Sequence, residues 1–418
     1  MSISSTTSIP TSELPLAVGE GRGGNVFTPA IANVDDPPQL SQSDSLPLPP
    51  SALPLSAQRS PRVLHAIAPS KLAGAETFLV RLLRRASLDD FVSHCVTSRC
   101  LANKDLLAAN MPFDRLRIGG KGNLLAIPRL AAAARRFQAD VLHSHLSTAS
   151  WWCGWLEQLG GPPSIGHVHG FTSAHWHRWQ SHLIACSAAV KQDLIDKGLA
   201  AERITVLHYP LDPNDMRPTS SRAAVRRELG ADDNTPVVGT FAHLSPKKGH
   251  RELVQAAAMV LNVIPRAQFW CFGEGPLRAE LEETARDLGI SDRFKLFGFR
   301  RDVANLMPAI DVMCLPSHRE PFGLVYVEAA LAEKPVIATN AGGAPEIITH
   351  NETGLLIPSP HSPLPTPHSA LADALFTLLD NRTLAATLGR RAREAALDRF
   401  SWPNYLAQLA LLYDRVRK

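Results

Sequence analysis

The sequence predicts an α/β protein of two doubly wound, Rossmann-like domains that face each other across a cleft. Two observations carry this prediction. Short apolar runs alternate with helical patterns from residue 62 to residue 209, and a second alternation of the same kind begins at residue 237. Between them, residues 209–218 contain three prolines, which is typical of a linker. Strand–helix alternation predicts a parallel sheet with helices on both faces.

The first alternation contains short runs rich in Val, Ile and Leu, which are typical of buried strands, and longer segments with helical periodicity. The strands are expected at residues 62–68, 90–98, 140–145, 164–170, 182–187 and 204–209. The helices are expected at residues 76–86, 148–160 and 188–199.

The second alternation follows the same rule and ends in consecutive helices. Its strands are expected at residues 237–244, 267–273, 294–299, 311–317, 335–340 and 354–358. Its helices are expected at residues 250–264 and 276–289, from about Pro321, at 344–350, 369–380, 383–397 and 403–416. We therefore expect a first domain at 61–210, a second at 211–395, and a C-terminal helix at 396–418 that packs back on the first domain.

The first 60 residues are rich in Ser, Pro and Thr and have no sustained apolar period. Such a segment buries too little apolar surface to offset the entropy of ordering it. Residues 1–60 are therefore predicted to form a disordered tail, with a tether for a partner protein as the alternative.

Charge and cysteine content narrow the class of protein. A net charge of +4 over 418 residues gives no reason to expect nucleic acid as a partner. The six cysteines include no CxxC pair, which predicts free, buried thiols in a reducing compartment. No apolar run approaches ~18 residues, so no transmembrane helix is expected. A basic segment followed by an apolar one is missing at the N-terminus, so no signal peptide is expected either.

Basic residues and glycines follow the predicted strands of the second domain, where ligands of such sheets bind. His243 and Lys248 lie in the loop after residues 237–242, just before a helix, where cations suit a diphosphate. A solvated basic loop is the alternative. The GEGP segment, Arg300 and an Ala-Gly-Gly segment follow the next strands.

The segment REPFGLVYVE, residues 319–328, follows the strand at 311–317. Proline is favoured at the first position of a helix, so we expect one to begin at Pro321. The backbone N–H groups of Phe322, Gly323 and Leu324 would then form an anion site. Glu320 would point into the same cleft. Glu328 would lie about two turns into the apolar helix, satisfied by a ribose diol or by a buried Lys or Arg.

Several of these segments, taken together, resemble glycosyltransferase family 4. The resemblance rests on the spacing of Glu320 and Glu328 with Pro-Phe-Gly between them, on SPKKG, FGEGP and LPS, and on PVIATNAGGAPEII followed by TGLLI. It covers most of residues 62–418, and the order of the motifs agrees. The family consists of retaining transferases of the GT-B fold that use nucleotide-sugar donors.

The resemblance implies a role for each matching residue. Glu320 would bind donor-sugar hydroxyls near the reacting carbon, the backbone of Phe322, Gly323 and Leu324 would hold the sugar and diphosphate, and Glu328 would bind the ribose. Lys248 would clamp the diphosphate, and the backbone around Arg300 would receive the base. In the first domain, Gly74 of LAGAE would approach the diphosphate and His169 of HVHG would lie near the sugar.

Two positions depart from the family pattern. Ala73 replaces one glycine of the usual pair, and His243 stands where the family commonly has arginine. Arginine is always charged and can bind two oxygens, whereas histidine titrates near neutrality. Either Lys247 compensates in the diphosphate clamp, or donor binding weakens as the pH rises.

Histidine pairs in the first domain, at 143–145, 167–169 and 175–177, raise the question of a metal site. Residues two apart on a strand share a face only in pairs, and no carboxylate or cysteine cluster accompanies them. The family mechanism requires no metal, so we expect none, and these histidines are interpreted as cleft-lining or core residues. Trp151, Trp152 and Trp155 are interpreted as core or cleft residues, with a sugar-stacking or membrane-facing patch as the alternative.

The predicted function is transfer of a sugar, with retained anomeric configuration, from a nucleotide-diphosphate sugar to a hydroxyl acceptor. The resemblance implies a glycan or glycolipid acceptor in polysaccharide or glycolipid synthesis, in the cytoplasm, with peripheral contact at the inner membrane face. The basic helix at 76–86 gives this contact weak support, and packing on the sheet is the alternative. A nucleotide-sugar epimerase of the same fold and a non-catalytic nucleotide-sugar-binding protein are the competing functions.

Overall fold

The computed structural model describes residues 59–68, 74–86, 90–98, 113–359 and 367–417. Nearly all of the predicted tail, residues 1–58, lies outside these ranges, as do Ala73 and Cys100. The five other cysteines are buried and free, as predicted.

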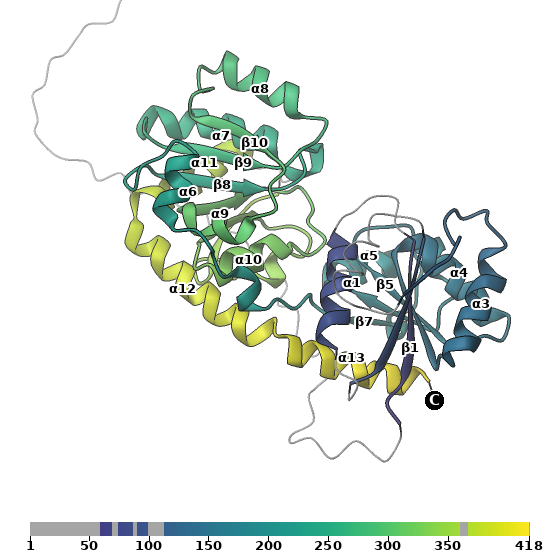
Figure 1. Ribbon diagram of the computed structural model, residues 1–418. Helices are drawn as coiled ribbons and strands as arrows, with labels where there is room; N and C mark the ends of the chain where they lie inside the picture. The colour runs from purple at the N-terminus through teal and green to yellow at the C-terminus, as the bar shows by residue number, and fades with distance from the viewer. Residues whose placement is uncertain (1–58, 69–73, 87–89, 99–112, 360–366, 418) are drawn as a thin grey trace, which may run out of the picture. The chain divides into compact units, whose positions relative to one another are not determined.

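The first sheet has seven parallel strands in the order β3-β2-β1-β4-β5-β6-β7 (Figure 1). The strands are β1 (Arg62–Ile67), β2 (Val92–Thr97), β3 (Phe113–Arg115), β4 (Val141–His145), β5 (Ser164–Val168), β6 (His182–Ala185) and β7 (Ile204–Val206). The helices that accompany them are α1 (Gly74–Arg85), α3 (Ala126–Phe137), α4 (Leu146–Gln158) and α5 (Ala188–Asp196). β3 and α3 were not predicted from the sequence.

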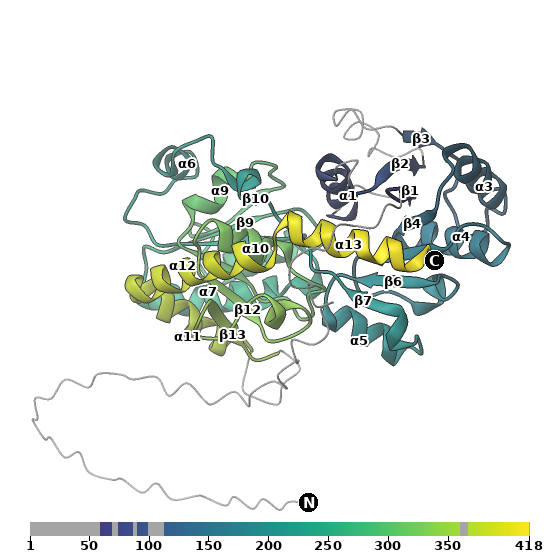
Figure 2. The same cartoon turned by 90° about the horizontal axis from the view of Figure 1, so that it is seen from below.

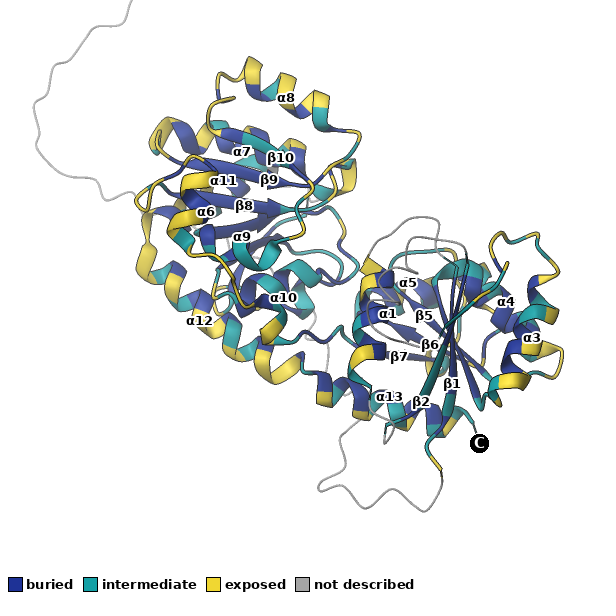
Figure 3. Ribbon diagram, viewed as in Figure 1, coloured by how far each residue is buried: buried dark blue, intermediate teal, exposed yellow. Residues whose placement is uncertain are grey.

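Burial along β1 shows how this sheet is covered. Val63 and Ile67 pack in the apolar cluster that contains α1, while Leu64 and Ala66 pack in the cluster that contains α3 and α4. Alternate residues of a strand point to opposite faces, so both faces of the sheet are buried. Figure 3 shows the strands almost uniformly buried and the exposed positions on helices and loops.

The second sheet has six parallel strands in the order β10-β9-β8-β11-β12-β13. The strands are β8 (Val237–Phe241), β9 (Gln268–Phe272), β10 (Phe294–Gly298), β11 (Val312–Leu315), β12 (Val336–Thr339) and β13 (Gly354–Ile357). The helices are α6 (Arg222–Glu228), α7 (His250–Val263), α8 (Arg278–Asp287), α9 (Val303–Ala309), α10 (Leu324–Leu331), α11 (Pro367–Asp380) and α12 (Arg382–Arg399). Two all-parallel sheets with helices on their faces confirm the predicted fold class.

The last helix, α13 (Trp402–Val416), packs on the first sheet, as predicted. Its buried residues, including Trp402, Leu409 and Tyr413, belong to the same apolar cluster as α1 and β1. Figure 2 shows α13 in yellow, following α12 at the end of the chain. The apolar face of α1 is buried in this cluster, with Phe78, Leu79 and Leu82 at most 4% exposed. The helix at 76–86 thus packs on the sheet, which was the alternative to membrane contact. Its apolar face is not available to a membrane.

Candidate functional site

The loops after β8 and β11 meet at the point where the strand order of the second sheet reverses. β8 and β11 are neighbours in space although two strands separate them in sequence. In doubly wound sheets this reversal is the usual position of a ligand. Lys248 lies in the first loop and Glu320 in the second, and Lys248 Nζ donates to Glu320 Oε2 over 2.6 Å.

Lys248 is held by a short turn that ends in a glycine. The turn Pro246–Lys248 is a 3-10 helix, and Gly249 follows with a φ of 73°. A Cβ on Gly249 would lie 1.9 Å from the carbonyl oxygen of Pro316, in the loop after β11. The left-handed backbone and this close approach both require glycine, so SPKKG sets the distance between the two loops.

Glu320 is 7% exposed and has a second side-chain partner, since Ser317 Oγ donates to its Oε2 over 2.9 Å. Its backbone is held as well, because Gly343 N donates to the Glu320 carbonyl over 2.7 Å. A Cβ on Gly342 would lie 2.1 Å from that carbonyl oxygen. The Ala-Gly-Gly segment therefore permits a close backbone approach, and the group it approaches is the backbone of Glu320.

The helix after β11 begins later than predicted. α10 begins at Leu324, and Gly323 precedes it with a φ of 97°. A left-handed residue cannot belong to the helix, so Pro321 is not its first residue and that expectation is wrong. The first hydrogen bond of the turn runs from Tyr326 N to the Gly323 carbonyl over 2.8 Å. The amides of Leu324 and Val325 therefore precede it at the N-terminus, while Phe322 is buried and stacks on His208 at 5.5 Å.

Glu328 lies in α10, one turn beyond its start. Burial raises the pKa of its carboxyl from 4.5 to about 7, and the charge of Arg81 partly opposes this shift. The charge of Arg81 only partly offsets the loss of hydration of this carboxylate. Hydrogen bonds from the hydroxyls of a ligand would stabilise its charged form.

His169 follows β5 in the first sheet and is held at both ring nitrogens. His169 Nδ1 lies 2.6 Å from the hydroxyl of Tyr209, and Nε2 lies 3.1 Å from His145 Nδ1. Burial lowers the pKa of His169 to about 3, so the ring is uncharged at neutral pH.

The other predicted donor-binding residues lie at strand ends, on loops or at a helix start. Gly74 is the exposed first residue of α1, where a Cβ would meet no atom within 4 Å. His243 is exposed in the loop after β8. The Arg300 guanidinium binds both carboxylate oxygens of Asp302, at 2.8 and 2.7 Å, and also Glu228, which leaves its backbone for the proposed contact with a base. The structure brings Lys248 and Glu320 into direct contact. Among the described residues, the side chains of His243 and Arg300 make no hydrogen bond to Lys248 or Glu320.

The sequence did not predict the roles of two residues at the contact between the start of α5 and the loops of the second sheet. Ser187 Oγ donates to the Pro321 carbonyl over 2.5 Å. Glu346 Oε2 accepts from Ala188 N over 2.7 Å, and Oε1 accepts from Ala189 N over 2.9 Å, at the start of α5. The same carboxylate lies 2.9 Å from His208 Nε2. A serine directly before Ala-Ala-Val is a typical helix cap, so Ser187 could have been predicted from the sequence. No nearby residue in the sequence indicates that Glu346 reaches the start of α5.

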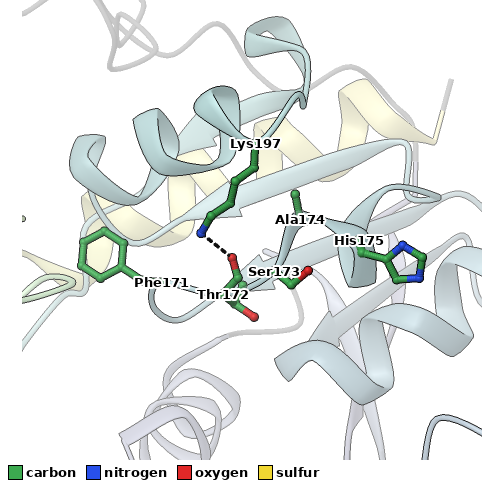
Figure 4. A pocket seen from close by; sticks show the side chains of 6 residues that line it. All are labelled: Phe171, Thr172, Ser173, Ala174, His175 and Lys197. Carbon is green, nitrogen blue, oxygen red and sulfur yellow. Dashed lines mark hydrogen bonds between the residues drawn. The ribbon is translucent and has the colours of Figure 1, made fainter.

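A pocket lies beside the loop that follows His169 (Figure 4). Thr172, Ser173 and His175 line it from this loop, and Lys197 Nζ donates to the Thr172 carbonyl over 2.7 Å. The ring of His175 stacks on the ring of Trp151, with their centroids 5.1 Å apart.

One of the three neighbouring tryptophans, Trp152, is a core residue. It is buried and donates to the Gly120 carbonyl over 3.0 Å.

Among the helices that the structure describes, none is both long and apolar enough to cross a bilayer.

Two family models match consecutive parts of the chain. A Glycosyltransferase Family 4 model matches residues 72–215, and a Glycosyl transferases group 1 model matches residues 221–395. The two matches lie on the two sheets and meet near the proline-rich linker.

Curated relatives and solved structures agree with these matches. The chain is 35% identical to a D-inositol 3-phosphate glycosyltransferase from Corynebacterium glutamicum (strain R) over 223 residues, 51% of this chain and 52% of the relative. It thus matches about half the length of that protein. It is 26% identical to an N-acetyl-alpha-D-glucosaminyl L-malate synthase from Bacillus anthracis over 306 residues, 70% of this chain and 78% of the relative.

Anabaena HepE, solved in complex with UDP and glucose, superposes with a TM-score of 0.74 at 26% identity, over 85% of this chain and 99% of that one. A sucrose-phosphate synthase from Thermosynechococcus elongatus, at 21% identity and a TM-score of 0.70, shares the fold. The chain therefore belongs to the GT-B glycosyltransferases, with a family 4 domain followed by a group 1 domain.

Proposed function

We propose that this glycosyltransferase transfers a sugar from a nucleotide-diphosphate sugar to a hydroxyl acceptor with retention of anomeric configuration. The observation that carries the proposal is the contact between Lys248 and Glu320 beside the start of α10. A half-buried cation, a buried carboxylate and the amides of a helix N-terminus lie together, as a phosphorylated sugar requires.

The donor binds across this arrangement. Lys248 and the amides at the start of α10 receive the diphosphate, which frees Glu320 to accept hydrogen bonds from the sugar hydroxyls. Glu328 accepts from the ribose hydroxyls one turn further along α10. The backbone around Arg300 receives the base, and Gly74 and His243 complete the diphosphate contacts. The complex of HepE with UDP and glucose supports a donor of this class.

In the proposed reaction, the bond between the anomeric carbon and the diphosphate oxygen breaks as the acceptor oxygen forms its bond on the same face. The acceptor proton passes to the departing phosphate oxygen. Lys248 and the helix amides stabilise the charge on the leaving diphosphate, which is electrostatic preorganisation and uses no metal ion. Glu320 positions the sugar and stabilises positive charge, and neutral His169 exchanges its contact with the Tyr209 hydroxyl for a hydrogen bond to a sugar hydroxyl.

The acceptor is assigned to the pocket beside His169. Its hydroxyl and imidazole groups, from Thr172, Ser173 and His175, suit a polyol, and the ring of Phe171 offers an apolar wall. Relatives include proteins named as phosphatidylinositol monomannoside mannosyltransferases, which supports a glycan or glycolipid acceptor. We place the reaction in polysaccharide or glycolipid synthesis in the cytoplasm, with any contact at the inner membrane face made outside the apolar face of α1.

A donor panel tests the proposal. Calorimetric titration of the purified chain with UDP-, GDP- and ADP-sugars should identify at least one that binds, and that donor should be hydrolysed slowly and transferred to an added acceptor. Release of the sugar as the α-anomer from an α-linked donor establishes retention. Conversion of the donor sugar without an acceptor would instead indicate an epimerase. Binding with neither hydrolysis nor transfer would indicate a nucleotide-sugar-binding protein.

A further inference from the structure

Five histidines from three neighbouring strands gather on one face of the first sheet. His65 on β1 pairs in register with His143 on β4, and His145 on β4 pairs with His167 on β5, while His169 follows β5. In a parallel sheet, paired residues share a face, as do residues two apart on one strand. The rings of His65 and His143 are accordingly 5.0 Å apart, and those of His143 and His145 are 4.4 Å apart.

Three of these rings converge on one point. His65, His143 and His145 are fully buried, and each offers a ring nitrogen within 4.8 Å of the other two. His65 Nδ1 and His145 Nε2 are 3.3 Å apart. Two imidazole nitrogens on a tetrahedral zinc ion, each at about 2.0–2.1 Å, are separated by about 3.3 Å. The observed distance therefore suits two ligands of one ion as well as it suits a hydrogen bond.

The third ring supplies an atom that the fold leaves unsatisfied. His143 Nε2 is buried and has no hydrogen-bond partner among the described residues. A buried polar nitrogen without a partner costs free energy, because its hydration is lost and no hydrogen bond replaces it. A bound cation would remove this cost.

The remaining nitrogens of the three rings are held from outside. His143 Nδ1 lies 2.6 Å from the Tyr413 hydroxyl, and His145 Nδ1 lies 3.1 Å from His169 Nε2. Ser93 Oγ lies 3.5 Å from His65 Nε2. Metal-binding histidines are oriented in this way, with the second nitrogen in a hydrogen bond that fixes the ring and its tautomer.

We propose that His65, His143 and His145 form a structural site for a divalent transition-metal ion, with zinc as its representative. Imidazole ligands suit zinc, nickel and copper and do not suit magnesium or calcium, which prefer oxygen. Three protein ligands leave one position for water, and a hydroxide there would offset part of the buried charge.

The site joins elements that are distant in the chain. It bridges β1 and β4 directly, and through Tyr413 it reaches α13 at the C-terminal end. The ion would therefore stabilise the packing of α13 against the first sheet. It takes no part in the proposed transfer, so this inference and the proposed function stand or fall separately.

The first test is metal retention by the tag-free full-length chain. The protein is stripped with chelator, incubated with one equivalent of zinc, desalted and measured by elemental mass spectrometry and thermal denaturation. We expect about one zinc ion per chain, a higher Tm, and loss of both on renewed chelation. A wild-type chain that retains no zinc and whose Tm responds to neither zinc nor chelator overturns the proposal.

Variants identify the ligands while preserving the outer hydrogen bonds. His143→Asn keeps a hydrogen-bonding nitrogen near Nδ1, and His65→Gln keeps one near Nε2, so each removes only the ligand atom. Zinc affinity should fall at least ~10-fold in both. His182→Gln is the matched control, because His182 is a buried histidine of the same sheet whose Nε2 bonds to Thr205 over 2.8 Å. Equal zinc retention in all three variants would show that zinc binds at an unrelated site and would contradict the assignment.

X-ray absorption of the zinc-loaded wild-type protein decides the question if a ligand variant does not fold. Three nitrogen ligands are expected, and a shell of oxygen ligands alone would contradict the site.

Discussion

Lys248 Nζ lies 2.6 Å from Glu320 Oε2 although 72 residues separate them, and Ser317 Oγ donates to the same carboxylate oxygen. In the free protein, the lysine assigned to the diphosphate is thus held by the glutamate assigned to the sugar. Donor binding must exchange this ion pair for a contact between lysine and phosphate. The ion pair compensates the charge of the buried Glu320 carboxylate until the donor arrives.

Glu320→Gln should separate catalysis from nucleotide binding. The amide removes the negative charge that faces the reacting carbon, so turnover is expected to fall about 100-fold or more. It also releases Lys248 from its ion pair, so the affinity for the nucleoside diphosphate should be unchanged or higher. Steady-state rates and calorimetry check the two effects, with exposed Glu352→Gln as the control. Near-normal turnover would refute the role of Glu320.

Glu328→Gln should change how stability depends on pH. The carboxyl pKa rises from 4.5 to about 7 in the folded chain, so the folded state binds this proton more tightly than the unfolded state. That contribution to the free energy of unfolding is complete below about pH 4.5 and is lost as the pH rises through 7. The variant should therefore have a higher Tm than wild type at about pH 8 and a flatter profile from about pH 5. Parallel profiles for the two proteins would contradict the shifted carboxyl.

Gly323→Ala should damage the loop that starts α10. The φ of 97° strains any side chain, and a Cβ would lie 2.3 Å from the ring of Tyr326. We expect a loss of more than about 1 kcal/mol in stability and a weaker donor affinity. Gly230→Ala is the matched control, because its φ is 79° but no atom lies within 4 Å of its Cβ. If both variants lose the same stability, the backbone strain alone is responsible and the contact with Tyr326 contributes nothing.

Glu346→Gln should weaken the connection between the group 1 domain and α5. Two oxygens of one carboxylate accept from the first two amides of this helix, where a negative charge is also favoured by the helix dipole. The amide retains one acceptor and loses the charge, so we expect a loss of about 1–2 kcal/mol. Chemical denaturation measures it, again with Glu352→Gln for comparison. An unchanged midpoint would show that these contacts contribute no stability.

His243→Arg should keep or raise donor affinity at about pH 8, where an ordinary imidazole is uncharged and arginine is not. His243 is exposed in the loop that carries Lys248, so the longer side chain has room to reach a diphosphate. Titration calorimetry with the identified donor compares the two proteins. A large loss of affinity in the arginine variant would show that histidine has a role of its own at this position.

Local patterns were sufficient for most of the fold. Buried strands such as β11 (VMCL) and β13 (GLLI) are short apolar runs, and helices such as α7 repeat their apolar residues every three to four positions. Such patterns are present in the sequence itself because each reports the burial of a single element. β3, α3, α6 and α9 were not predicted. β3 has only three residues, FDR, and α3 has only a narrow buried stripe within an arginine-rich segment. α6 and α9 have seven residues each, too few to show a clear helical period.

The sequence by itself determined the two-sheet architecture, the glutamates eight positions apart and the basic loop before α7. Only the tertiary structure decided that Lys248 meets Glu320, that Glu346 reaches the start of α5, and that His65 joins His143 and His145. The tertiary structure also decided where α10 begins, because packing around Gly323 fixes its left-handed backbone. The physical reason is that strand order and register set which distant residues meet, whereas periodicity reports only which face of each element is buried.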